Sequence, residues 1–312
     1  MSTSATAALP EATIEVIASL GEHRVLSTAQ VHAIHLPVRG LRRTQQLLAD
    51  LEQAGLIGHV EARSAPRRLW FLTELGADLA VSSGELSDHP KLLGTREAAG
   101  PLRAHTFAVN EVGVSFLEAA RKRDDDFGPL SWRHEVAHPL SRGRGRSRRT
   151  LFADAVLTYL RSEETYIGIE QRFIELDRAT LSVDRLVSEL VRYAQLHRAR
   201  DKGGEALWRY RYPVFPRVIC VLAGAPRKAL IRRRDVALVL LGSDPQLDRA
   251  YEVAIYFCLL EDLKRSGPFA PIFRSVGEPD RKVDWLGESE DHDEEKGEVD
   301  AAGSSSDRGG VP

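Results

Sequence analysis

Three acidic residues stand where two neighbouring β-strands would bring them together. Asp154 falls early in the apolar stretch 151–160, and Glu175 and Asp177 end the stretch 166–177. Glu175 and Asp177 are two residues apart, so both point to the same face of a strand. Carboxylate oxygens suit Mg²⁺ and Mn²⁺, which activate water for attack on a phosphate. We therefore predict a Mg²⁺ or Mn²⁺ site in which Asp154, Glu175 and Asp177 are metal ligands and catalytic residues.

The predicted metal site has two further candidate ligands and one structural alternative. Either Glu111 or Glu135 is expected to complete the set of ligands. The alternative is that the three acids are surface residues, or that they form ion pairs with Arg178 and Arg192 that only stabilise the fold. The spacing of the nearby histidines matches no common metal site. We expect His105, His134 and His138 to be ordinary core or surface residues. We expect the same of Tyr193, which follows the second of the two predicted strands.

The elements that must position the acids alternate in a regular order. Apolar periodicity predicts a helix, three strands, a helix and a strand over residues 101–122, 132–140, 151–160, 166–177, 183–198 and 215–222. With acids at these places, the αβββαβ order resembles the PD-(D/E)xK nuclease fold, which we assign to residues 101–275. The resemblance implies metal-dependent DNA cleavage. Asp177 stands where that motif has Lys, and we expect Arg192 to supply the missing positive charge.

Residues 10–82 predict a winged helix-turn-helix: helix, short helix, helix, then a two-strand hairpin. Such a module inserts the start of its third helix into the major groove and touches the backbone with its wing. Polar and basic residues gather at both places, and we predict that they contact double-stranded DNA: Arg39, Arg42, Arg43, Gln45 and Gln46 on the third helix, and Arg63, Arg67 and Arg68 on or beside the hairpin. The alternative is a module that contacts only protein.

A second basic segment lies in the loop before the strand that carries Asp154. Its arginines alternate with glycine and serine, as in an arm that contacts phosphates. We predict DNA contacts from Arg142, Arg144, Arg146, Arg148 and Arg149. The alternative is a mobile hairpin tip. Residues 83–100, rich in Ser, Gly, Asp and charge, are predicted to be a linker.

The formal net charge of −2 is an average over unlike parts. Residues 1–90 carry −3, residues 91–286 carry +8, and residues 287–312 carry −7. The last segment has almost no large apolar residues, so we predict a disordered acidic tail. The basic central part favours a nucleic-acid partner, although the total charge does not.

Other features limit the class of protein. No apolar run approaches the roughly 18 residues of a membrane span, and the N-terminus has no secretory signal pattern. The two cysteines, Cys220 and Cys258, lie far apart in apolar stretches, which favours a reducing compartment. We therefore expect a cytoplasmic protein without membrane contact. The sequence leaves the oligomeric state open.

Three segments resemble the replication-relaxation family of actinobacterial plasmids and mobile elements. They are Leu102–Asn110, the start of the strand with Asp154, and Phe173–Thr180 with Arg192-Tyr193 following. The resemblance covers roughly residues 10–260. Its Glu-x-Asp matches Glu175 and Asp177, so it implies that Asp177 is a family feature. It also implies a role in plasmid replication and DNA relaxation.

Three functional hypotheses follow. The first is a DNA-binding protein whose winged helix selects a site and whose nuclease-like domain nicks or relaxes DNA with Mg²⁺. The second is a non-catalytic DNA-binding regulator or replication accessory factor that keeps only the nuclease fold. The third is a protein-interaction scaffold that does not bind DNA.

Overall fold

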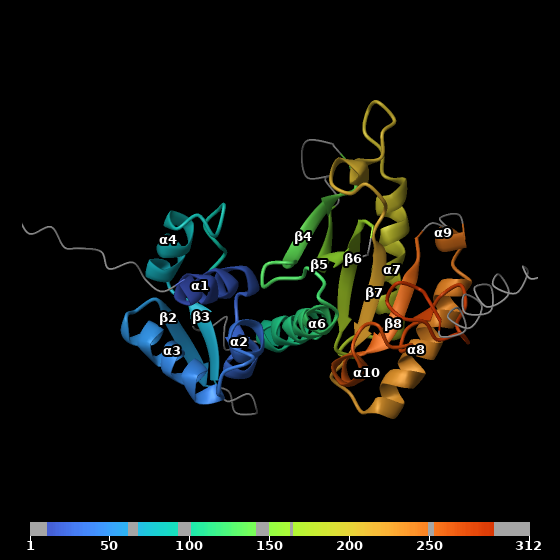
Figure 1. Cartoon of the computed structure of the whole chain (residues 1–312). Coiled ribbons are helices and arrows are strands. Elements are labelled where there is room, and N and C mark those ends of the chain that lie inside the picture. The colour runs from blue at the N-terminus through green and yellow to red at the C-terminus, as the bar shows by residue number, and fades with distance from the viewer. Residues whose placement is uncertain are drawn as a thin grey trace, which may run out of the picture.

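The computed structural model shows a mixed α+β fold with two sheets (Figure 1). It describes residues 11–61, 68–92, 101–141, 150–162, 165–248 and 253–289. The smaller sheet lies in the N-terminal part of the chain, and the larger sheet in the rest. In the described part of the chain, no helix is long and apolar enough to cross a membrane.

The N-terminal unit has the predicted order of three helices and a hairpin. Its elements are α1 (Glu11–His23), β1 (Leu26–Ser27), α2 (Thr28–His35), α3 (Leu41–Gln53), β2 (Ile57–Glu61), β3 (Arg68–Leu72) and α4 (Glu74–Ser82). The sheet order is β1-β3-β2. Ser27 caps α2: its hydroxyl accepts the Gln30 N–H, and the Gln30 side chain accepts the Ser27 N–H.

The larger sheet has the predicted αβββαβ order at its core. Its elements are α6 (Pro101–Arg123), β4 (Trp132–Pro139), β5 (Thr150–Ser162), β6 (Ile167–Asp177), α7 (Val183–Arg198), β7 (Arg217–Leu222), α8 (Arg227–Gly242), α9 (Pro245–Asp248), β8 (Ile255–Leu259), α10 (Leu260–Ser266) and β9 (Arg274–Ser275). The strand order is β4-β5-β6-β7-β8-β9. The β6–β7 and β7–β8 pairs are parallel, and the others antiparallel.

Two apolar layers cover this sheet. Alternate residues of β6 and β7 face opposite sides: Ile174 and Ile219 pack in the layer of α6, while Phe173 and Val218 pack in the layer of α7 and α8. Trp285, ten residues past the expected end of this domain, is fully buried against Phe116 and Tyr159.

The N-terminal unit packs directly on α6 and β4, and one apolar core runs through both parts. Asn110 of α6 donates to the carbonyl of Val25 at 2.8 Å and lies 2.8 Å from the ring of His134. His23 at the end of α1 stacks on Trp132 at 4.1 Å between ring centres. These contacts fix α1 against the start of β4.

Candidate functional site

The site lies where β5 and β6 separate. Their ladder ends at the pair Ala155–Ile174. Two residues further along β6, the backbone N–H of Leu176 donates to the carboxylate of Asp154 at 2.8 Å instead of to a β5 carbonyl. The Asp154 side chain therefore fills the opening between the two strands.

Glu175 faces Asp154 from the next strand. It accepts a 2.5 Å hydrogen bond from the Tyr193 hydroxyl on α7. Burial raises the pKa of the Glu175 carboxyl well above its ordinary value, and the nearby charge of Asp154, with a hydrogen bond between the two carboxyls, raises it further. A cation bound beside Asp154 would offset this effect on Glu175.

His105 on α6 completes the surroundings of Asp154. Its Nε2 lies 3.0 Å from Asp154 Oδ1. Burial lowers the pKa of His105, but the hydrogen bond and the charge of Asp154 outweigh burial, and the net pKa is raised. The ring is about one-third exposed. The spacing of the histidines in the sequence does not predict the contact between His105 and Asp154, because this contact arises from the packing of α6 on the sheet.

Asp177 lies on the same face of β6 as Glu175 but has a different partner. Arg233 of α8 contacts both of its carboxylate oxygens, through Nε and, at 3.1 Å, through Nη2. Both side chains are about nine-tenths buried. Asp177 also accepts the N–H of Ala179. Its oxygens are thus committed to a buried ion pair, which favours the structural alternative for this residue.

The other expected members of the site also lie elsewhere. Arg192 donates to the carbonyl of Thr150 at 2.6 Å, at the start of β5. Glu111 binds Gln30 and Lys264, and Glu135 binds Arg24 at 2.6 Å. These contacts hold α6 and β4 to their neighbours. Neither glutamate is added to the Asp154–Glu175 pair.

The pair fits a divalent cation with few protein ligands. Among the described residues, no group of three or more His, Cys, Asp or Glu side chains is placed to hold a metal ion. Mg²⁺ is usually held by one or two carboxylates, with waters and substrate phosphates completing its octahedron. Asp154 and Glu175 supply such a donor set, and a cation would relieve the repulsion between them.

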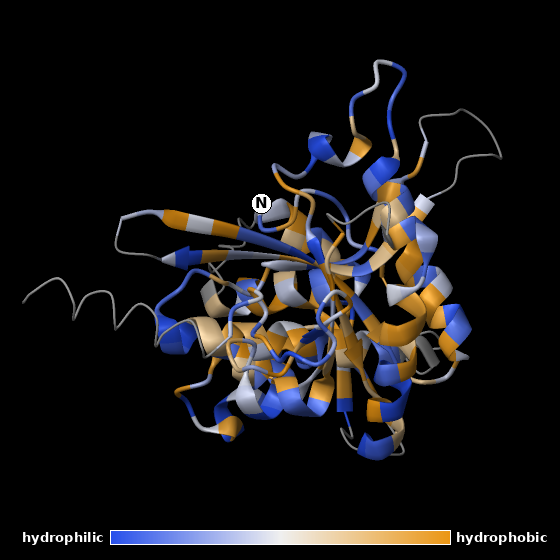
Figure 2. Cartoon of the chain, turned by 90° about the vertical axis from the view of Figure 1, so that its right-hand side faces the viewer, coloured by the Kyte–Doolittle hydropathy of each residue, from blue (hydrophilic) through white to orange (hydrophobic). Residues whose placement is uncertain are grey.

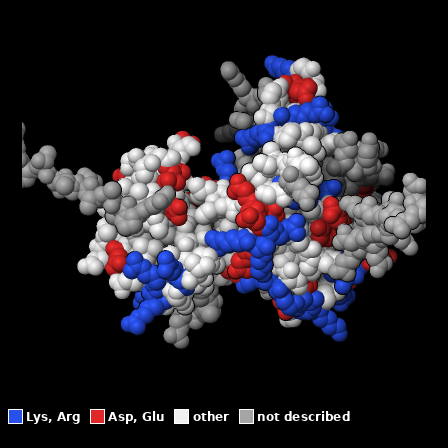
Figure 3. All heavy atoms as spheres, in the orientation of Figure 1, with Lys and Arg blue, Asp and Glu red and all other residues white. Residues whose placement is uncertain are grey.

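A basic surface lies on α3. Arg39, Arg42 and Arg43 are exposed, as are Gln45 and Gln46, and blue side chains gather over α3 in Figure 3. Within the described residues, none of these arginines has an ion-pair partner. Gln46 donates to Asp50 at 2.8 Å. On the hairpin, Arg68 pairs with Glu61 at 3.1 Å.

Several predicted DNA contacts lie outside the described residues. These are Arg63 and Arg67, together with the arginines of the loop before β5: Arg142, Arg144, Arg146, Arg148 and Arg149.

Comparison with known proteins gives one match. The family model described as replication-relaxation matches residues 17–206. The matched stretch includes α3, His105, Asp154, Glu175, Asp177 and Tyr193 and ends before α8, which carries Arg233. No curated protein and no solved structure matches the chain.

Proposed function

Because this chain belongs to the replication-relaxation family, we propose that it acts in replication of a plasmid or mobile element by binding double-stranded DNA. The exposed arginines at and just before the start of α3, which have no ion-pair partner among the described residues, support this proposal. In a winged helix-turn-helix this part of the third helix enters the major groove. Arginine there contacts phosphates and the acceptor edge of guanine.

The second part of the proposal is metal-dependent cleavage of one DNA strand by a PD-(D/E)xK-like domain. The observation that carries it is the place of two carboxylates where the β5–β6 ladder ends: Asp154 binds the N–H of Leu176 there, and the buried Glu175 precedes Leu176 on β6. A bound Mg²⁺ would neutralise the phosphate and lower the pKa of an attacking water. Asp154 and Glu175 hold this ion, and Tyr193 fixes the orientation of Glu175.

His105 takes the place of the absent lysine in this proposal. Asp177, at the motif's lysine position, is bound to Arg233, and Arg192 binds the backbone of Thr150. The His105 ring instead contacts Asp154 and is partly exposed. It donates a hydrogen bond or a proton to a phosphate oxygen beside Asp154.

A second candidate is a DNA-binding replication factor without catalysis. It is favoured by the Asp177–Arg233 pair, which leaves two carboxylates rather than three at the site. This candidate uses α3 in the same way and leaves Asp154 and Glu175 without a bound metal.

Nicking of supercoiled plasmid in Mg²⁺ or Mn²⁺ separates the two candidates. Cleavage predicts nicked circles with wild type and with Asp184→Asn, an exposed aspartate of α7. It predicts none with Asp154→Asn, although that variant still binds DNA. If wild-type protein at stoichiometric concentration leaves the plasmid supercoiled in both metals, the non-catalytic candidate is correct.

A further inference from the structure

The β5–β6 hairpin ends in a strand edge that no described segment covers. β6 pairs with β5 from Ile167 onward, but its pairing with β7 begins only at Arg172, opposite Arg217. On the β7 side, residues 167–171 make no backbone hydrogen bond to another described residue. In Figure 2 the hairpin projects to the left of the body of the molecule. Its outer strand edge is therefore free to pair with another chain.

One face of this edge is apolar. Ile167 and Ile169 are 69% and 61% exposed, and they point the same way because they are two residues apart. Tyr166, beside the turn, is 58% exposed. Soluble proteins usually protect such an edge with Lys, Pro, a bulge or a covering segment. From Tyr166 to Gln171 the sequence has no Lys, Arg or Pro.

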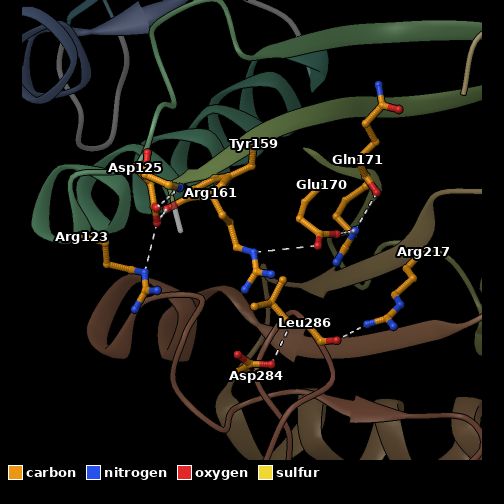
Figure 4. Close-up of polar contacts among 11 residues, drawn as sticks. Arg123, Asp125, Tyr159, Arg161, Glu170, Gln171, Arg217, Asp284 and Leu286 are labelled. Atoms are coloured by element: carbon orange, nitrogen blue, oxygen red, sulfur yellow. Dashed lines mark hydrogen bonds and ion pairs between the residues drawn. The ribbon is translucent and has the colours of Figure 1, made fainter. Parts of the chain in front are cut away.

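The opposite face is committed to contacts within the chain. Glu170 lies 2.9 Å from Arg172 and 3.9 Å from Arg161, as Figure 4 shows for Arg161. Arg172 is 4% exposed and lies over the ring of Trp285 at 4.7 Å. These contacts hold one face of the hairpin against the rest of the chain, and the two arginines compensate the charge of Glu170. Its apolar face and its free edge remain for a partner.

We infer that this edge pairs with the same edge of a second copy of the chain, antiparallel and centred on Gly168. Opposite residues of an antiparallel pair share a face, so Ile167 of each copy then lies opposite Ile169 of the other. The two-fold symmetry gives two such pairs. Centring on Glu170 would instead place two like charges opposite each other. A pairing centred on Ile169 would place Ile167 opposite Gln171 of the second copy. It would also bring the second strand into the position that β7 occupies.

Charge also favours a second copy over nucleic acid. From Tyr166 to Gln171 the edge carries one acid, Glu170, and no basic residue that could contact phosphates. The contact is a closed two-fold interface.

The size of the surface sets the strength of this association. Four isoleucines, two tyrosines and a short ladder bury less than the roughly 1,200–2,000 Å² of a stable complex. We therefore expect a weak dimer that forms as protein concentration rises. This inference does not depend on the proposed function.

Disulfide cross-linking tests the register. Cys220 and Cys258 are fully buried, so an added cysteine is the accessible one. Under mild oxidation, an equal mixture of Ile167→Cys and Ile169→Cys chains is expected to form covalent dimers faster than either variant alone, because only the mixed pair lies directly opposite. Val239→Cys, 71% exposed on α8, is the matched control. Equal rates for the mixture and this control would overturn the inference.

Sedimentation equilibrium of the full chain is the second test. Wild type is expected to shift from monomer to dimer with concentration, and Ile169→Lys to weaken dimerisation by about tenfold or more. Val239→Lys should leave it unchanged. A wild type that stays monomeric at its highest soluble concentration, or a dimer that is lost in Val239→Lys but kept in Ile169→Lys, would contradict the proposal.

Discussion

The hydroxyl of Tyr193 donates a 2.5 Å hydrogen bond to Glu175, from α7 to the end of β6. This contact orients one carboxyl of the pair toward the other. The position of Tyr193 on an apolar helix face predicts only a role in packing, and this hydrogen bond shows a second role. Its consequences for metal binding can be measured without any assay of DNA cleavage.

Tyr193→Phe removes the hydrogen bond but keeps the ring. Because residues that orient a metal ligand affect affinity, we expect Mn²⁺ to bind about 10- to 100-fold more weakly. Calorimetric titration with Mn²⁺ measures this change. Tyr212→Phe is the matched control, since that hydroxyl contacts His138 and not the carboxyl pair. An equal loss in both variants would show a general effect on packing rather than on Glu175.

The Asp177–Arg233 pair is expected to stabilise the fold and not to bind the metal. Removing one partner of a buried ion pair leaves a charge uncompensated, so Arg233→Met should lower the free energy of unfolding by about 3 kcal/mol. Asp177→Asn should also destabilise the chain, yet keep its affinity for Mn²⁺, whereas Asp154→Asn should lose it. Urea denaturation and calorimetry measure the two effects. Loss of Mn²⁺ binding in a folded Asp177→Asn variant would make Asp177 a ligand.

Acid should weaken the contact between the N-terminal unit and the larger sheet. Burial lowers the pKa of His23 to about 3 and that of His134 well below 6.5, so both rings are neutral in the folded chain at neutral pH. The unfolded chain binds their protons as pH falls below 6.5. Stability is therefore full above that pH and decreases toward pH 3, by up to about 1.4 kcal/mol per pH unit for each ring.

Urea unfolding of wild type and of His23→Gln between pH 7.5 and 5 measures this dependence. The variant lacks one titrating group, so its free energy of unfolding should fall less steeply with acid. Identical slopes for the two proteins would mean that His23 is protonated equally in the folded and unfolded states.

DNA affinity should depend on the arginines of α3. Each phosphate contact contributes about 0.9 to the slope of log affinity against log salt. Replacing Arg42 and Arg43 together by alanine should therefore reduce this slope by about 2 if both contact phosphates. Fluorescence anisotropy with duplex DNA measures it. Replacing Lys228 and Arg232, exposed on α8, is the control. A larger loss from the α8 pair would move the DNA surface away from α3.

Local patterns in the sequence predict the elements and two members of the site. Strand periodicity places Asp154 and Glu175 on neighbouring strands. Asp177 was predicted to be a metal ligand, and its contact with Arg233 could not be predicted, because Arg233 lies 56 residues away on a helix whose approach depends on the parallel crossover. The contact of His105 with Asp154 likewise depends on how α6 crosses the sheet, which spacing does not encode.

We propose that a divalent cation binds between Asp154 and Glu175. A crystal of the full chain soaked in Mn²⁺, measured at a wavelength where manganese scatters anomalously, tests it directly. We expect one anomalous peak within coordination distance of both carboxylates, with Asp177 still bound to Arg233. A soaked crystal with no peak at this pair, or with its peak on Asp177, would contradict the claim.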